Sequence, residues 1–204
     1  MYRIMIVDDN PAITEILGRM IRKEGYDTIE ATSGAQALVL LTTETPDLIL
    51  LDILMEPMNG WETLRQIKNN ERTKDIPVMM ITAKSLAPDE LQQYSALFED
   101  YIQKPIPRRE LYDLIAQFFR KMSTLDEDVA MAREKGADED KLTDFRELSR
   151  EIEVRQRLIR LLKKVYVLPG DDNRKKAEIR SVIEDMASGL SMLEDRLIEI
   201  KREL

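Results

Sequence analysis

Short apolar runs alternate with amphipathic stretches along residues 1–122, and this alternation limits the possible folds more than any other feature of the sequence. The amphipathic stretches repeat their apolar residues at three- and four-residue intervals, which is typical of helices that bury one face. Strands separated by helices predict an α/β fold, with a doubly wound, five-stranded parallel sheet and helices on both of its faces. The five expected strands are Ile4–Val7, Thr28–Glu30, Leu48–Leu51, Val78–Ile81 and Tyr101–Gln103.

Local signals mark where three of the helices begin. The pair Asn10–Pro11 is a typical N-cap followed by a proline in the first helical turn. The stretch Ser33–Gln36 has the pattern of a capping box at the start of a second helix. The last helix of this half follows Pro107, and its apolar stripe reaches Met122. We therefore expect one domain over residues 1–122.

The character of the sequence changes after this domain. Residues 123–140 carry seven acidic and two basic side chains, and we interpret them as an acidic linker that is partly helical. Residues 141–204 predict an all-α hairpin of two long helices, with its turn at 168–170. The second helix has a heptad seam, which is typical of a coiled coil. The seam residues are Ile179, Ile183, Met186, Leu190, Leu193, Leu197, Ile200 and Leu204.

Composition excludes several classes of site. The 204 residues include no cysteine, which excludes disulfides and thiolate metal sites. They include no histidine either, so imidazole ligands, histidine-based triads and a phosphohistidine relay within the chain are excluded. The net charge of −8 disfavours binding of the whole molecule to polyanions. The sequence shows no signal peptide and no apolar run of the ~18 residues that span a membrane, and we expect a cytoplasmic location.

Polar side chains follow the ends of four expected strands. Asp8 and Asp9 follow the first strand, Asp52 the third, and Thr82 and Lys104 the fourth and fifth. Ligands of doubly wound sheets gather beyond the carboxyl ends of the strands, so these side chains should meet at one edge. Each residue alone has an ordinary explanation as a cap or a solvated strand end. Complementary groups at four strand ends favour a shared site.

Electrostatics indicates which ligand this site needs. Two carboxylates about 4 Å apart repel each other by roughly 4 kcal/mol at an effective dielectric near 20. A divalent cation reverses that repulsion, and oxygen ligands alone favour Mg²⁺. Lys104 and Thr82 then remain for a phosphoryl group, and Asp52 is the candidate nucleophile because a carboxylate can form an acyl phosphate.

These motifs resemble those of one known family. The stretches IVDDNP, LILLDILMEPMNG, ITAK and YIQKP are similar to the receiver domain of two-component response regulators, and together they cover residues 1–122. The resemblance implies a flavodoxin-like sheet with strand order 2-1-3-4-5. It also implies that a partner histidine kinase phosphorylates Asp52. The residues after 122 contain no Gly-rich phosphate loop, metal-ligand cluster or nucleophile–base pair, so we expect no separate enzymatic output.

The resemblance also implies roles for the remaining residues of the site. By position, Asp9, Asp52 and the backbone carbonyl of Leu54 ligate Mg²⁺, and Asp8 assists through water. Thr82 and Lys104 are expected to bind the phosphoryl oxygens. Tyr101 matches the aromatic switch residue that turns inward when Thr82 moves toward the phosphoryl group.

Two places depart from the usual receiver pattern. The proline after the phosphoacceptor is shifted by one position in Met55–Pro57, which affects access to the phosphoryl group. The loop at Leu97–Glu99 reads Leu-Phe-Glu where receivers often have Gly-Ala, which affects the surface that reports the switch. Neither departure involves the acids, the threonine or the lysine.

The role of residues 141–204 stays open between three hypotheses. We favour a homodimer in which two hairpins form a four-helix bundle, since two helices alone make a thin core; the alternative is an intramolecular hairpin. The second hypothesis is nucleic-acid binding by a basic hairpin tip at residues 155–180, which contain nine basic and three acidic side chains. The third and least favoured is phosphatase chemistry toward another receiver by Glu184 or Glu194. The kinase and the downstream protein partner cannot be named.

Overall fold

The computed structural model describes residues 1–83, 90, 93–94, 96–166 and 173–204. The chain divides into two compact units, Met1–Tyr112 and Asp113–Leu204, and helix α5 contributes residues to both. The hairpin turn expected at 168–170 lies outside the described residues.

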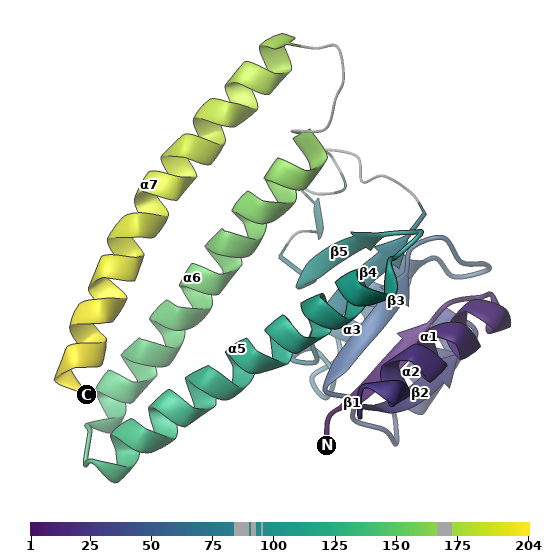
Figure 1. The fold of residues 1–204 in the computed structure, drawn as a ribbon, viewed down its shortest axis with the longest axis horizontal. Helices are drawn as coiled ribbons and strands as arrows, with labels where there is room; N and C mark the ends of the chain where they lie inside the picture. The colour runs from purple at the N-terminus through teal and green to yellow at the C-terminus, as the bar shows by residue number, and fades with distance from the viewer. Residues whose placement is uncertain (84–89, 91–92, 95, 167–172) are drawn as a thin grey trace. The chain divides into compact units, whose positions relative to one another are not determined.

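The N-terminal unit contains a five-stranded, all-parallel sheet in the order β2-β1-β3-β4-β5 (Figure 1). Both the α/β fold class and the expected strand order are confirmed. Each expected strand is present and extends by at most one residue at either end. The strands are β1 (Arg3–Val7), β2 (Asp27–Ala31), β3 (Leu48–Asp52), β4 (Val78–Thr82) and β5 (Asp100–Gln103).

The core of this unit lies around the three central strands. Every residue of β3 and β4 is buried, as are the last four residues of β1. Strands covered on both faces read as continuous apolar runs, which is why these three were the clearest in the sequence. Val7 pairs with Leu51, and Asp52 pairs with Ile81. This register brings the ends of β1, β3 and β4 to the same edge of the sheet.

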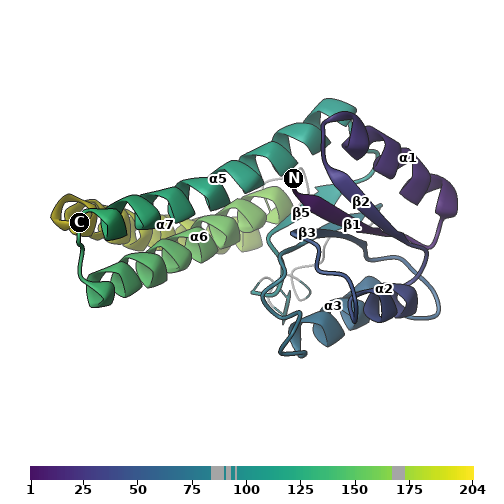
Figure 2. The ribbon, with the colours of Figure 1, turned by 90° about the horizontal axis from the view of Figure 1, so that it is seen from below.

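Helices cover both faces of the sheet, with α1 on one face and α2 and α3 on the other (Figure 2). The predicted N-caps are present: the Asn10 side chain accepts a hydrogen bond from the Ala12 N–H at 3.0 Å. The Ser33 hydroxyl accepts one from the Gln36 N–H at 3.1 Å. These bonds satisfy backbone donors that have no partner inside the helix. The helices are α1 (Pro11–Lys23), α2 (Gly34–Leu40) and α3 (Gly60–Lys68).

The C-terminal unit is formed by α5 (Arg108–Glu134), α6 (Glu139–Tyr166) and α7 (Asn173–Glu203). The apolar stripe of α5 was expected to stop near Met122, but the helix continues for twelve further residues. Most of its acidic residues are exposed on the helix surface, and the partly buried Asp128 pairs with Lys201 of α7. Their charge therefore does not interrupt the helix. The helix ends before Gly136, whose φ of +86° is a conformation that glycine adopts readily.

Three helices share the core of this unit. Val129 and Ala132 of α5 pack with Leu142 and Phe145 of α6, and residues of α7 pack against this cluster. Two isolated helices would bury only a narrow stripe, and the second half of α5 supplies the additional surface. The α7 residues at this core are Leu197, Ile200 and Leu204, which all belong to the predicted heptad seam.

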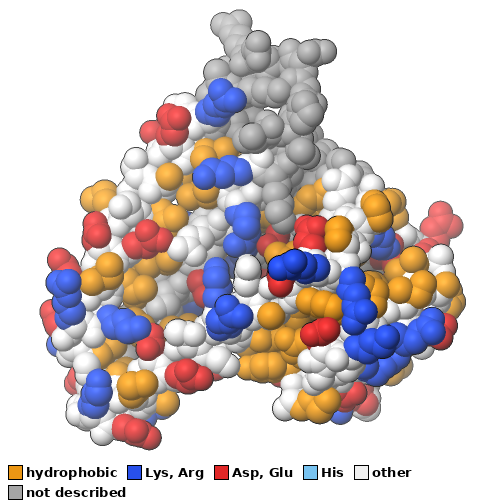
Figure 3. Space-filling model, viewed as in Figure 1, with side chains coloured by type: hydrophobic (Ala, Val, Ile, Leu, Met, Phe, Trp, Pro, Cys, Tyr) orange, Lys and Arg blue, Asp and Glu red, His pale blue; other side chains and the backbone are white. Residues whose placement is uncertain are grey.

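Apolar side chains also remain on the surface of α7. Met192 is 74% exposed, and Val182 and Ile198 are each about half exposed. On the face seen in Figure 3, hydrophobic side chains lie among acidic and basic ones along the long helices. Within the described residues, no helix is both long enough and apolar enough to cross a membrane.

Candidate functional site

Three carboxylates meet at the carboxyl edge of the sheet. Asp8 and Asp9 directly follow β1, and Asp52 is the last residue of β3. One oxygen from each carboxylate lies within 4.8 Å of the others. Asp8 and Asp52 are buried, whereas Asp9 is exposed. The cluster thus has two buried acids and one that faces solvent, and its oxygens suit a hard divalent cation such as Mg²⁺.

Lys104, which directly follows β5, joins the two buried acids. Its ammonium donates a hydrogen bond to Asp8 Oδ2 at 2.5 Å and another to Asp52 Oδ2 at 2.9 Å. Its side chain is 20% exposed, so the two ion pairs are largely shielded from water. Removing either partner from such a group leaves a buried charge without compensation.

Burial and pairing act in opposite directions on these groups. Burial raises the pKa of Asp52, and the hydrogen bond from Lys104 partly offsets this effect. Burial disfavours the charged form of Lys104, but the hydrogen bonds to Asp8 and Asp52 outweigh it and raise the pKa of the ammonium. Lys104 therefore remains a cation at neutral pH, held between two acids.

Backbone N–H groups hold all three carboxylates in place. The Asn10 N–H donates to Asp8 at 2.9 Å. The N–H groups of Leu54 and Glu56 donate to Asp52 and Asp9, each at 3.3 Å. The loop after β3 is thus connected by hydrogen bonds both to its own strand and to the loop after β1.

The remaining predicted residues lie on neighbouring strands. Thr82 ends β4 and is fully buried, and its carbonyl accepts the Lys104 N–H at 2.8 Å. Tyr101 is buried on β5 and pairs with Met80, two residues before Thr82. Leu54 follows β3, and its side chain is exposed. The structure therefore brings the acids and Lys104 into direct contact, with Thr82 at the next strand end.

Gly60, at the start of α3, is a supporting residue that the sequence analysis did not identify. A Cβ atom at this position would lie 2.1 Å from the carbonyl oxygen of Asp52 and 2.7 Å from the Cα of Ile53. The Gly60 N–H also donates to the Ile53 carbonyl at 2.9 Å. Only glycine allows α3 to start this close to the end of β3. The Asn-Gly pair before the helix was the available signal, because it combines an N-cap with a small residue.

An aromatic cluster explains one of the two departures from the receiver pattern. Phe98, in the unusual loop, is fully buried, and its ring centroid lies 5.9 Å from that of Trp61. Trp61 also stacks on Tyr94 with a centroid distance of 4.4 Å, and its Nε1–H donates to Glu90 at 2.9 Å. The aromatic residue of this loop therefore packs on α3 instead of forming an exposed surface.

The acids proposed for phosphatase chemistry lie on α7. Glu194 accepts a hydrogen bond from the Gln156 amide of α6 at 2.7 Å, and Glu184 is exposed. The basic hairpin tip is only partly described, because the side chains of residues 164–179 lie outside the described part of the structure. Nucleic-acid binding by this tip therefore stays a prediction.

Comparison with known families finds matches to two successive parts of the chain. Residues 4–116 match the model of the response regulator receiver domain. Residues 121–204 match the model described as Metanogen output domain 2. The receiver match contains the three carboxylates and Lys104, and the second match contains α6 and α7.

Relatives of known sequence match just over half of this chain. The DNA-binding dual master transcriptional regulator RpaA of Synechocystis is 33% identical over 121 residues, which are 59% of this chain and 50% of RpaA. The protein PilH of Pseudomonas aeruginosa is 34% identical over 115 residues, which are 56% of this chain and 95% of PilH. The chain thus spans about half the length of RpaA but nearly all of PilH.

Solved structures agree with this assignment. The N-terminal domain of a response regulator receiver protein from Methanoculleus marisnigri is 48% identical, with a TM-score of 0.50, and the match covers 57% of this chain and 95% of that domain. The response regulator TrrA of Thermotoga maritima is 32% identical, with a TM-score of 0.52, over 57% of this chain and 98% of TrrA. Since the receiver model matches more than half of its residues, the chain belongs to the response regulator receiver domain family.

Proposed function

We propose that this chain is a two-component response regulator in which Asp52 accepts a phosphoryl group from a partner histidine kinase in a Mg²⁺-dependent step. One observation carries the proposal: three carboxylates lie within 4.8 Å of one another, and Lys104 bridges the two that are buried. TrrA, a relative at 32% identity, was solved in complex with Mg²⁺–BeF, which supports an equivalent use of the pocket.

In the proposed reaction, a carboxylate oxygen of Asp52 attacks the phosphorus of the donor phosphohistidine. The oxygen–phosphorus bond forms while the phosphorus–nitrogen bond breaks, and the donor imidazole leaves with that electron pair and takes a proton from water. Lys104 and the Thr82 hydroxyl then contact the phosphoryl oxygens and offset their charge. Tyr101 is the proposed switch residue, and its ring turns inward when Thr82 moves toward the phosphoryl group.

The metal would be held by Asp9, Asp52 and the Leu54 carbonyl, with Asp8 acting through water. When bound, Mg²⁺ supplies positive charge to the carboxylates and to the phosphoryl group. The protein supplies the positions of these ligands, because backbone N–H groups fix each carboxylate before any ligand arrives.

The C-terminal unit is the proposed output. Phosphorylation would change protein–protein contacts or homodimerisation through residues 141–204, and the chain would act in the cytoplasm without a separate enzymatic output. Two observations support an interaction role: α7 exposes apolar side chains, and most of its heptad seam is only partly buried. The name of RpaA describes DNA binding, and the alternative function for this chain is nucleic-acid binding by the basic tip at residues 155–180.

The proposal is tested by intact-protein mass spectrometry after incubation with Mg²⁺ and acetyl phosphate. Wild type should gain the mass of one phosphoryl group, and chelation of the metal should prevent the gain. Asp52→Asn should gain nothing, because its amide is not a competent nucleophile.

Asp75→Asn is the matched control, since Asp75 is an exposed aspartate in the same unit. It should be phosphorylated like wild type. If wild type never gains the phosphoryl mass, or if Asp52→Asn gains it equally, Asp52 is not the acceptor and the proposal is wrong.

A further inference from the structure

The C-terminal unit contains a groove between its three helices. It has a volume of about 330 Å³, within the range typical of small-molecule sites. Phe145 and Ile152 of α6 and Leu197 of α7 form its apolar surface. The groove adjoins the core cluster of this unit, because Phe145 and Leu197 belong to both. An apolar body bound here would extend the existing core.

Polar groups without partners also line this groove. Ser149 is 8% exposed, and its hydroxyl has no hydrogen-bond partner among the described residues. Arg120 and Lys121 of α5 line the groove as well, and neither forms an ion pair with another described residue. The Ser149 hydroxyl is not sealed from solvent but opens into the groove, where it can bond to water or to a ligand group. Two unpaired cations indicate that the ligand group is an anion.

The acidic groups of the groove do not compensate these cations. Asp128 forms an ion pair with Lys201 of α7, which also lines the groove. Glu153 also lines the groove and has an interaction of its own. The positive charge of Arg120 and Lys121 is therefore available to a ligand.

Cationic and apolar side chains both line this groove. Arg120 and Lys121 of α5 and Lys201 of α7 lie among the apolar side chains of Phe145, Ile152 and Leu197. A ligand that fits this lining has an anionic group and an apolar body.

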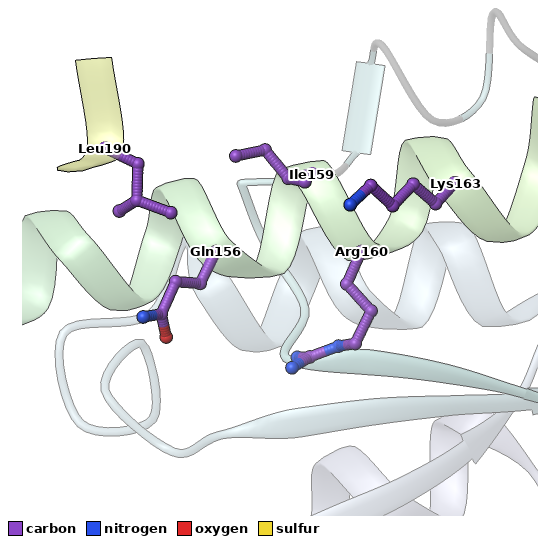
Figure 4. Close-up of a pocket in the computed structure, with 5 residues that line it drawn as sticks. All are labelled: Gln156, Ile159, Arg160, Lys163 and Leu190. Carbon is purple, nitrogen blue, oxygen red and sulfur yellow. The ribbon is translucent and has the colours of Figure 1, made fainter. Parts of the chain in front are cut away.

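A neighbouring groove of about 540 Å³ extends this positive character along α6. It is lined by Ile159, Arg160, Lys163 and Leu190, and Gln156 lines both grooves. Figure 4 shows Gln156 and Arg160 extending to the same side of α6. Arg160 and Lys163 thus add two cations along the same helix and reinforce the preference for an anion.

We propose that the α5–α6–α7 groove binds a small amphipathic organic carboxylate. The carboxylate contacts Arg120, Lys121 and the Ser149 hydroxyl, and the apolar body packs over Phe145 and Leu197. A ligand bound at this site would act on the output unit independently of phosphorylation at Asp52. This role goes beyond the proposed function and is tested without Mg²⁺ or a phosphodonor.

Isothermal titration of the full-length protein with octanoate, below its micelle-forming concentration, tests the proposal. Wild type should bind one octanoate per chain. The double variant Arg120→Gln/Lys121→Gln should weaken binding roughly tenfold or more, because it removes two charge-assisted contacts. Ser149→Leu should abolish binding, because its side chain fills the groove without changing charge.

The double variant Lys135→Gln/Arg150→Gln is the matched control, since it removes the same charge from exposed positions of the same unit. It should bind octanoate within about twofold of wild type. Octyltrimethylammonium, with the same tail and opposite charge, should not bind. Absence of octanoate binding, equal binding of the cation, or equal affinity of the two double variants would each overturn the proposal. The two double variants change exposed residues only, so their affinities for octanoate can be compared even if Ser149→Leu does not fold.

Discussion

Lys104 is the residue on which the electrostatics of the receiver site depends. Its ammonium contacts both buried carboxylates, so one cation compensates two acids that would otherwise repel each other. Asp9 remains exposed beside them and leaves an excess of negative charge at the mouth of the site. That excess is what a divalent cation would neutralise.

The substitution Gly60→Ala tests the close approach of α3 to the end of β3. In Gly60→Ala, the new Cβ would collide with the backbone of Asp52 and Ile53, and neither contact is with a flexible side chain. We expect the free energy of unfolding of the N-terminal unit to fall by about 1–3 kcal/mol. Phosphorylation by acetyl phosphate should also slow, because Asp52 must shift. Urea unfolding and intact-mass kinetics measure the two effects.

Gly189→Ala is the matched control for this substitution. A Cβ at Gly189 meets only Arg155, at an ordinary distance of 3.5 Å, and the position lies inside helix α7. Alanine is the better helix former, so this variant should be more stable by roughly 0.5–1 kcal/mol. Wild-type stability and phosphorylation rate in Gly60→Ala would contradict the close approach of α3 to β3.

Among the elements, α5 extends furthest beyond its apolar stripe. The stripe reaches Met122, residues 123–140 were expected to be a partly helical acidic linker, and the helix continues to Glu134. The last turns of the helix bury Val129 and Ala132, whereas most of its carboxylates face solvent. Arg133 then pairs with Glu139 across the turn to α6, at 2.7 Å. A run of acids predicts a solvated surface, and a helix can provide that surface as well as a linker can.

Phe145 tests the importance of the three-helix core. It is almost fully buried between helices, so Phe145→Ala should lower the free energy of unfolding of the C-terminal unit by about 3–5 kcal/mol. Amide hydrogen exchange along α6 measures this loss, because protection there reports opening of this unit.

Met192→Ala is the comparison variant, since Met192 is exposed on α7 and should change stability by less than about 0.5 kcal/mol. Equal protection of α6 in both variants would show that the cluster around Phe145 is not the core of this unit.

For the whole molecule, the main question is how two compact units act together. The chain carries a net charge of −8, yet its longest helix keeps apolar residues at the surface. Burying them against a second copy would complete a helical bundle, which supports the proposed homodimer. Phosphorylation could then act by favouring one association state.

Light scattering measures this association directly. We expect a dimer in at least one of two states, the unmodified protein and the protein treated with Mg²⁺ and beryllofluoride. Removal of residues 141–204 should give a monomer in the unmodified state, because it removes the predicted contact surface. A full-length monomer in both states would exclude dimerisation as the output.

Features that depend on a local residue pattern could be predicted before folding is considered. Buried parallel strands are continuous apolar runs, so their positions and the polar residues at their ends could be read directly. The carboxyl ends of parallel strands meet at one edge, which is why the residue pattern alone was enough to group Asp8, Asp9, Asp52, Thr82 and Lys104. Helix caps such as Asn10 were equally local.

Features that depend on contacts between residues distant in the sequence could be identified only in the folded structure. The space beside Asp52 that requires Gly60, the burial of Phe98 on Trp61, and the third helix of the C-terminal core are such features. No periodicity encodes them, because each depends on which surfaces meet after folding.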